Sequence, residues 1–285
     1  MLKLSHEFFG TSDPDQARNA QETTGAAVAE LTAAVVNEYK EYFDLLLAAR
    51  RQHLRDDLAS TIATAIIDGA PMPQLESRSY CVAAATAGDD TTSGASAGRV
   101  WALGENPDEF EYVAEHPKLV RGLVEESIRW TSPAKITMRS AAGDIEIFDR
   151  KFCKGDRVCV GWVSGNRDEQ VIEAPVRFKM DRDRALHTSF GWGPHDCTGQ
   201  HLARTEMRMH FEELFSRVTS MAIADRPATD ASLSVSGPKA VPIRYQLKLF
   251  QLELLAIVPD GRWVTPEAGC RFPHTNRPTL QSPRR

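Results

Sequence analysis

Apolar residues near the start of the chain recur at intervals of three and four, which is the spacing of one face of an α-helix. The pattern predicts helix between about residues 2 and 68, and its clearest stripe consists of Val28, Leu31, Val35, Tyr39, Tyr42 or Phe43, and Leu46. The sequence Asp-Gly-Ala-Pro at 68–71 predicts a turn. A second long helical stretch is predicted from about Met72 to Asp108, and shorter helices follow to Trp130, before Pro133 ends the run.

The pattern then changes to β-branched residues that alternate or cluster, which predicts strands at 136–141, 144–148 and 158–163. A loop-rich segment leads to Cys197, and an amphipathic helix is predicted from about Gln200 to Val218. Its apolar stripe consists of Ala203, Met207, Phe211, Leu214 and Val218. Residues 261–285 are rich in Pro and Arg without periodicity and are predicted to be disordered. The fold class predicted is mainly α with small β-sheets.

Composition excludes several classes of protein. The 285 residues are 42% hydrophobic and 26% charged, which is ordinary for a globular chain. A formal net charge of −5 offers no general grip on nucleic acid. No signal peptide is visible, and no apolar run approaches the roughly 20 residues that span a bilayer. Five scattered cysteines suit a reducing compartment, so we expect a soluble, cytoplasmic protein.

Candidate chemistry concentrates between Phe190 and Arg204, where one cysteine stands between glycines just before the last amphipathic helix. Gly193 and Gly199 would let the backbone turn tightly around Cys197. The positive end of the following helix would favour its thiolate. These features predict a loop that presents a single thiolate ligand.

Two other interpretations of Cys197 stay open from the residues alone. A lone cysteine before a helix is most often a buried, unreactive thiol. A zinc site of His195, Cys197 and His201 is also conceivable, although the sequence has no second half-site of paired cysteines or histidines.

The segment nevertheless resembles the haem-binding loop of the cytochrome P-450 family. The resemblance is carried by the residue types and spacing of Phe190, Gly193, His195, Cys197 and Gly199. The continuation Gly-Gln-His-Leu-Ala-Arg at 199–204 is common in soluble bacterial members. The resemblance implies that these residues bind haem b, with Cys197 as the axial thiolate of its iron.

A second segment, Ala-Gly-Asp-Asp-Thr-Thr at 87–92, resembles the family's oxygen-activation motif. By itself it would suggest a loop or a carboxylate pair for a metal, but the apolar helical sequence on both sides favours a helix. A glycine and hydroxyl side chains would loosen the helix locally and make room for dioxygen. The resemblance assigns Asp90 and Thr91 to proton delivery, and Gly88 to the small residue that faces the haem.

A third segment has Glu126 and Arg129 one helical turn apart, which by itself suggests an ordinary ion pair on the helix surface. It is similar to the family's Glu-x-x-Arg, and the resemblance adds Arg182 as the third member of a buried network. We expect this network to brace the cysteine loop. The resemblance further implies that Arg139, His187 and His195 contact the haem propionates, although any of them could be an ordinary surface side chain.

The reaction that the resemblance implies is monooxygenation. One oxygen atom of O2 would enter a small apolar substrate of the terpenoid, steroid or fatty chain class. Electrons would come from NAD(P)H through a separate ferredoxin-type donor and its reductase, because no GxGxxG follows a predicted strand. Arg204 and Arg208 are candidates to dock that acidic partner. Substrate contacts are expected from 83–87, 134–137 and 234–237.

The sequence also departs from the family. A helical portion that normally precedes the equivalent of Met1 has no counterpart here, Thr198 replaces an aliphatic residue, and 148–151 replaces a glycine turn. We expect a partial cytochrome P-450 domain at 1–246 and an unrelated tail at 247–285. A catalytically inactive haem-binding fragment therefore stands as the alternative.

Overall fold

The computed structural model describes residues 2–9, 13, 25–182, 187–232, 234–248, 256–257 and 263–264. The chain separates into two units, residues 1–247 and residues 248–285. In the second unit, the described residues form the antiparallel pair β11 (Ala256–Ile257) and β12 (Trp263–Val264). The rest of the predicted tail, with Cys270, lies outside the described residues.

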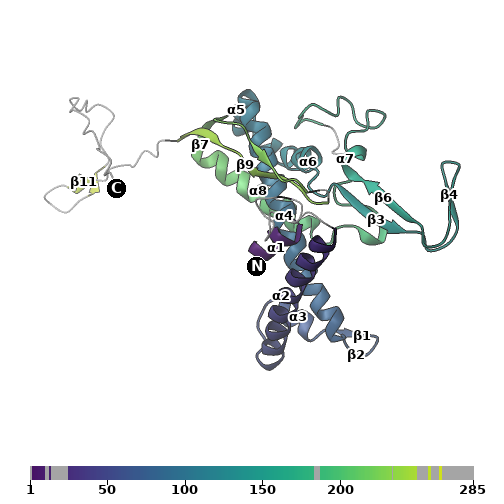
Figure 1. Ribbon diagram of the computed structural model, residues 1–285. Coiled ribbons are helices and arrows are strands. Elements are labelled where there is room, and N and C mark those ends of the chain that lie inside the picture. The colour runs from purple at the N-terminus through teal and green to yellow at the C-terminus, as the bar shows by residue number, and fades with distance from the viewer. Residues whose placement is uncertain are drawn as a thin grey trace. The chain divides into compact units, whose positions relative to one another are not determined.

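Helices dominate the first unit, as predicted. The described helices are α1 (Leu2–Phe9), α2 (Gly25–Gln52), α3 (Leu58–Ala63), α4 (Gln74–Glu105), α5 (Pro107–Glu115), α6 (Val120–Thr131), α7 (Trp162–Gly165) and α8 (Gln200–Arg217), with 3-10 turns η1 (Pro117–Leu119) and η2 (Gly193–His195). The long α4 runs through the middle of this unit, with α2 and α3 toward its lower end and α5, α6 and α8 around its upper end (Figure 1). It therefore joins the two helical groups.

The strands form small antiparallel pairs. They are β1 (Ile66–Ile67) with β2 (Ala70–Pro71), β3 (Ile136–Ser140) with β6 (Arg157–Gly161), β4 (Ile145–Ile147) with β5 (Arg150–Phe152), β7 (Val218–Ile223) with β10 (Ile243–Leu247), and β8 (Ala228–Thr229) with β9 (Pro238–Ala240). The turn predicted at 68–71 is the end of the β1–β2 hairpin, where Asp68 and Gly69 have positive φ. The fold class inferred from the sequence is confirmed.

Three apolar clusters build the core. The first packs the α2 stripe against α3 and α4 and consists of Val35, Tyr39, Phe43, Leu47, Ile62 and Cys81. The second lies among α4, α5, α6, α8 and β7 and includes Leu103, Phe110, Leu123, Phe211 and Met221. The third is small and joins Ala95, Val124, Ile128 and Met207, with Phe190 packed against it. Because Phe190 opens the cysteine loop, the third cluster fixes that loop against α4, α6 and α8.

The structure differs from the predicted elements in three details. The strand predicted at 158–163 ends at Gly161, and Trp162 and Val163 instead begin helix α7. Strand β5 was not foreseen, because the turn before it contains no glycine; Phe148 and Asp149 take φ values of 48° and 60° instead, and Ile147 pairs with Arg150. Two-residue hairpin turns favour such positive φ values. The last helix ends at Arg217, and Val218 is already extended as the first residue of β7. Its burial supplied the apolar periodicity that sequence analysis assigned to the helix.

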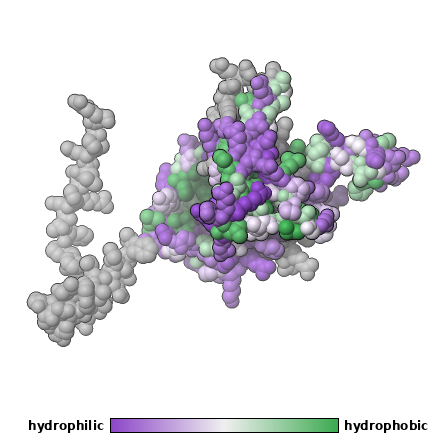
Figure 2. Space-filling model, turned by 90° about the horizontal axis from the view of Figure 1, so that it is seen from below, coloured by the Kyte–Doolittle hydropathy of each residue, from purple (hydrophilic) through white to green (hydrophobic). Residues whose placement is uncertain are grey.

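The surface carries many large apolar side chains. Figure 2 shows such residues breaking up the hydrophilic surface of one face. Tyr80, Met138, Trp192 and Leu202 all have more than half of their surface exposed. Within the described part of the chain, every helix is too short or too polar to span a lipid bilayer.

Candidate functional site

The cysteine loop is closed by its own backbone. The Cys197 N–H donates to the Phe190 carbonyl oxygen at 2.9 Å, and the Asp196 N–H donates to the Gly193 carbonyl oxygen at 2.9 Å. Gly191 and Gly193 both have a φ of +77°, which side chains disfavour. The tight turn expected at Gly193 is therefore present.

Gly199 does not turn in this way, because its φ is −84°. A Cβ there would lie 3.9 Å from the Cys197 sulfur, which is ordinary contact. The conformational argument made for Gly199 was therefore wrong. The Cys197 side chain is itself partly exposed, and α8 begins three residues later. The interpretation of Cys197 as a fully buried structural thiol is excluded, since the buried cysteine of the described four is Cys81.

A chain of polar contacts runs from α6 to the cysteine loop. Glu125 accepts hydrogen bonds from the Arg204 Nε at 2.6 Å and Nη2 at 3.1 Å, and it contacts the His187 Nε2 at 3.1 Å. Arg204 also donates to the Gln200 side chain. Gln200 in turn donates to Asp196, whose carboxylate accepts the Cys197 N–H at 3.0 Å.

The charges in this chain compensate one another. Burial raises the pKa of Glu125, but hydrogen bonds from His187 and Arg204 outweigh it and lower that pKa to about 2. The Arg204 guanidinium lies 4.4 Å from the centroid of the Phe190 ring. Arg204 thus braces the cysteine loop, although its side chain is still 31% exposed; its assignment as a docking residue stays a prediction. Sequence analysis missed its contact with Glu125, because 79 residues separate the two and no local pattern marks the pair.

The network predicted from Glu126 and Arg129 is present and buried. Arg129 donates to the two Glu126 carboxylate oxygens at 2.7 and 2.8 Å, and the Arg182 Nε donates to one of them at 3.1 Å. Arg129 also donates to the Asn166 carbonyl oxygen at 2.8 Å. Both side chains of the Glu126–Arg129 pair are at most 2% exposed, so this is not the surface ion pair of the alternative interpretation.

Asn166 extends this network to residues 188–189, which directly precede the cysteine loop. Its side-chain amide donates to the hydroxyls of Ser132 and Ser189 at 2.7 Å. Its side-chain oxygen accepts the Thr188 N–H at 2.7 Å. Because Ser189 directly precedes Phe190, the network reaches the start of the loop, as expected.

The Ala87–Thr92 segment lies within α4, and the helix continues through it without interruption. The Thr91 hydroxyl donates to the Ala87 carbonyl oxygen at 2.7 Å. A Cβ added at Gly88 would meet nothing within 4 Å, so one side of the helix is open there. The loop interpretation of this segment is excluded. The expected local loosening is not seen, because α4 is continuous here, although open space lies next to Gly88.

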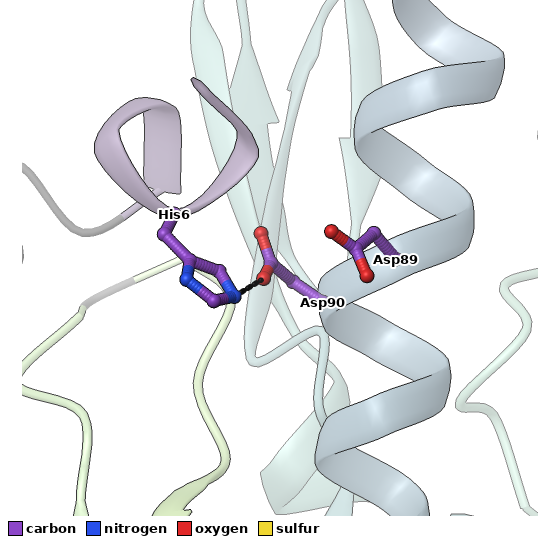
Figure 3. A group of neighbouring side chains, drawn as sticks. All are labelled: His6, Asp89 and Asp90. Atoms are coloured by element: carbon purple, nitrogen blue, oxygen red, sulfur yellow. Dashed lines mark ion pairs between the residues drawn. The ribbon is translucent and has the colours of Figure 1, made fainter. Parts of the chain in front are cut away.

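Asp90 is the most constrained side chain of this segment. The Ser5 hydroxyl donates to its Oδ2 at 3.0 Å, and the His6 Nε2 lies 3.3 Å from its Oδ1 (Figure 3). Burial raises the pKa of Asp90. Among the described residues, His6, Asp89 and Asp90 also bring ligand-type atoms within 4.8 Å of one another, while the zinc alternative of His195, Cys197 and His201 forms no such group.

The three candidate propionate contacts lie in different surroundings. Arg139 lies on β3 and donates to the Met138 carbonyl oxygen. His195 is exposed in η2. The His187 side chain is only 3% exposed, and its Nδ1 has no hydrogen-bond partner in the described part of the structure. Of these three residues, His187 is therefore the one with a buried polar atom that lacks a hydrogen-bond partner among the described residues.

A cleft of about 890 Å³ opens between the start of α6, the start of α8 and residues 180–182. Its basic lining residues are Lys118, Arg121, Arg182, His201, Arg204 and Arg208. The acidic lining residues Glu125 and Glu126 are already paired with arginines. The cleft is therefore cationic.

The fold and the cysteine loop agree with comparisons to known proteins. The sequence profile of the family described as Cytochrome P450 matches residues 14–223. Cytochrome P450-terp from Pseudomonas sp is 39% identical over 246 residues, which are 86% of this chain and 58% of that protein. Linalool 8-monooxygenase from Pseudomonas putida is 28% identical over 84% of this chain and 57% of its own length. The chain belongs to the cytochrome P450 family.

The crystal structure of CYP108D1 from Novosphingobium aromaticivorans superposes with a TM-score of 0.73 at 37% identity. The match covers 87% of this chain and 61% of that one. The chain thus spans less than two thirds of each of these relatives. The residues present fit a haem in three respects: a partly exposed thiol, open space beside Gly88, and a buried, unsatisfied nitrogen on His187.

Proposed function

We propose that the protein is a haem-thiolate monooxygenase that inserts one oxygen atom of O2 into an apolar small molecule. The partly exposed Cys197 thiol, held at the start of α8 by the loop and by the Glu126–Arg129 network, carries this proposal. The expected substrate belongs to the terpenoid, steroid or fatty chain class, and the relative named Linalool 8-monooxygenase supports the terpenoid class. Four free cysteines among the described residues fit a reducing cytoplasm.

The chain's own residues would divide the work. When bound, haem supplies one-electron redox chemistry toward dioxygen. Cys197 would hold it as a thiolate, while Phe190, Gly193 and Gly199 shape the loop around the sulfur. His187, His195 and Arg139 would hold the propionates. For His187 this needs both ring nitrogens protonated, with Nε2 donating to Glu125 and the unsatisfied Nδ1 donating to a propionate.

Asp90 and Thr91 would deliver protons. Reducing O2 to water and one inserted oxygen atom consumes two electrons and two protons. The raised pKa of Asp90 lets its carboxyl keep a proton to higher pH than an ordinary aspartate. The Thr91 hydroxyl, on the next residue of α4, would pass that proton on, and the open space at Gly88 would admit dioxygen.

Electrons would come from NAD(P)H through a ferredoxin-type donor and its reductase. The cationic cleft beside α8 supports docking of an acidic partner, with Lys118, Arg121 and Arg208 as the contacts. Arg204 and Arg208 pair with Glu125 and Glu212, so their charge is partly compensated, and Lys118 and Arg121 would supply more of the attraction.

Replacement of Cys197 tests the proposal. Haem-loaded protein, reduced and exposed to carbon monoxide, is expected to show the strongly red-shifted Soret band of thiolate ligation. Cys197→Ala should abolish the band, because no other residue would supply the thiolate. Replacing Cys81, Cys153, Cys159 or Cys270 is the matched control and should preserve it. A thiolate spectrum that survives Cys197→Ala would overturn the assignment.

A second candidate is an inactive haem-binding fragment of the same family. The observation that favours it is the chain's coverage of only 58% of Cytochrome P450-terp. Such a fragment would keep the red-shifted band and lack turnover, so spectroscopy combined with product analysis separates the two.

A further inference from the structure

Helix α1 covers the acid of α4 and occupies both of its carboxylate oxygens. The Ser5 hydroxyl approaches Asp90 from a residue more than 80 positions earlier in the sequence. The neighbouring His6 imidazole approaches the other carboxylate oxygen (Figure 3). The Asp90 side chain is 14% exposed, Ser5 is 1% exposed, and the His6 side chain is 44% exposed. The contact therefore joins the largely buried carboxylate of Asp90 to the partly solvent-exposed imidazole of His6.

We propose that Ser5 and His6 are positioning residues that couple the seating of α1 to the ionisation of Asp90. This inference rests on the proposed proton-delivery role of Asp90. An ionised Asp90 accepts a hydrogen bond from Ser5 and attracts a protonated His6, so α1 is held against α4. A protonated Asp90 no longer attracts the imidazolium. Protonation of Asp90, which makes it a proton donor, thus also weakens its contact with His6 on α1.

The charges around Asp90 set the direction of this coupling. Burial raises its pKa, and Asp89 on α4 and Asp230 before β9 act in the same direction. His6 and Ser5 on α1 oppose them and favour the ionised carboxylate. Tyr39 on α2 completes the surroundings, and burial and the carboxylates of Asp90, Asp89 and Glu7 raise its own pKa. Since α1 supplies the groups that favour ionisation, removing them must favour the protonated acid.

By reciprocity, the Ser5 and His6 contacts favour the seated α1 when Asp90 is ionised, while the burial of Asp90 acts in the opposite direction. Helix α1 is only eight residues long and packs on α2 and α4. An isolated helix of this length is not stable in water, so its order depends on such tertiary contacts. A small change in charge at Asp90 is therefore expected to change how often α1 leaves its seat.

Carboxyl titration by NMR tests the first half of the proposal on the 285-residue chain. We expect His6→Gln and Ser5→Ala each to raise the pKa of Asp90, read from its 13C chemical shift. Lys3→Gln is the matched control, because Lys3 is on the same helix, is 86% exposed and pairs with Glu7 instead. An Asp90 pKa unchanged in both His6→Gln and Ser5→Ala would overturn the proposal.

Amide hydrogen exchange tests the second half. Amides of α1 should exchange about three- to tenfold faster in Asp90→Asn than in the parent chain, as expected for loss of a partly covered ion pair and hydrogen bond. This difference in exchange rate between the two chains should disappear at a pH below the Asp90 pKa, where Asp90 of the parent chain is also uncharged. Protection of α1 that is the same in both chains at every pH would contradict the coupling.

Turnover of the haem-loaded protein separates this inference from the proposed function. In His6→Gln, the fraction of consumed NAD(P)H that yields product is measured against pH. The pH at which this fraction changes should move upward together with the Asp90 pKa. If the Asp90 pKa rises in His6→Gln but the pH dependence of coupling does not change, the positioning role of His6 is overturned, and the proposed function is not. If Asp90→Asn itself couples normally, the proposed proton role of Asp90 fails, while the contact measured by NMR stands or falls on its own result.

Discussion

Glu125 is the residue whose charge has the clearest consequence for stability. Hydrogen bonds from His187 and Arg204 lower its pKa from 4.5 to about 2. A lowered pKa stabilises the fold above the unfolded value of about 4.5, and the contribution is lost as the pH falls toward 2. We expect Glu125→Gln to reduce the free energy of unfolding at pH 7 by about 1–3 kcal/mol. Urea unfolding of both chains between pH 7 and 3 should show the difference shrinking at low pH.

Glu212→Gln is the matched control for that measurement. Glu212 pairs with Arg208 at 3.1 Å on the surface of α8, where both side chains are half exposed. Exposed pairs of this kind contribute at most about 1 kcal/mol. A Glu125 effect no larger than that of Glu212, or one that persists unchanged to pH 3, would show that the polar chain to Cys197 does not stabilise the fold.

At the scale of elements, α4 depends on one close approach to α6. A Cβ at Gly98 would lie 2.8 Å from the Thr131 Cγ2 and closer still to its hydroxyl. In the same helix, a Cβ at Gly88 would meet nothing within 4 Å. In the haem-free chain we expect Gly98→Ala to destabilise by about 1–3 kcal/mol through overpacking. Gly88→Ala should stabilise by about 0.5–1 kcal/mol, because alanine is the better helix former.

Thermal or urea unfolding of the two variants measures this opposite pair of effects. Adding Thr131→Ala to Gly98→Ala should recover part of the loss, since it removes the atoms that clash. If both glycine variants changed stability in the same direction, packing between α4 and α6 would not be the reason for the glycine at position 98.

For the whole molecule, we predict that haem affinity depends on how much of the family's length the chain spans. The 246 matched residues cover 58% of Cytochrome P450-terp, and several large apolar side chains of this chain are exposed. If roughly 100–200 Å² of the apolar haem surface stays in water, about 2.5–5 kcal/mol of binding energy is lost. This predicts haem affinity some two to four powers of ten below that of the full-length relative.

Haem titration of this chain, measured beside Cytochrome P450-terp, tests the prediction. A chimera that adds the relative's unmatched residues to this chain should recover most of the difference. Tight stoichiometric haem and full turnover in the 285-residue chain would contradict the prediction, and would mean that its own residues enclose the haem.

The sequence by itself determined the features that depend on short-range spacing. Apolar periodicity located α2, α4 and α8, because a helix face repeats within a few residues. The turn at Gly193 follows from a conformation that glycine adopts freely. The ion pair of Glu126 with Arg129 follows from their separation by one helical turn. The order of these motifs along the chain was sufficient to recognise the cytochrome P450 family, which the family match confirms.

Only the tertiary structure decided which distant side chains meet. It brought His6 to Asp90 and Arg204 to Glu125, pairs that are separated by long stretches of chain and marked by no local pattern. It also placed Phe148 in a strained turn, because the pairing of β4 with β5 outweighs that residue's own backbone preference. Such contacts arise from the packing of whole elements, and local sequence periodicity carries no information about which elements pack together.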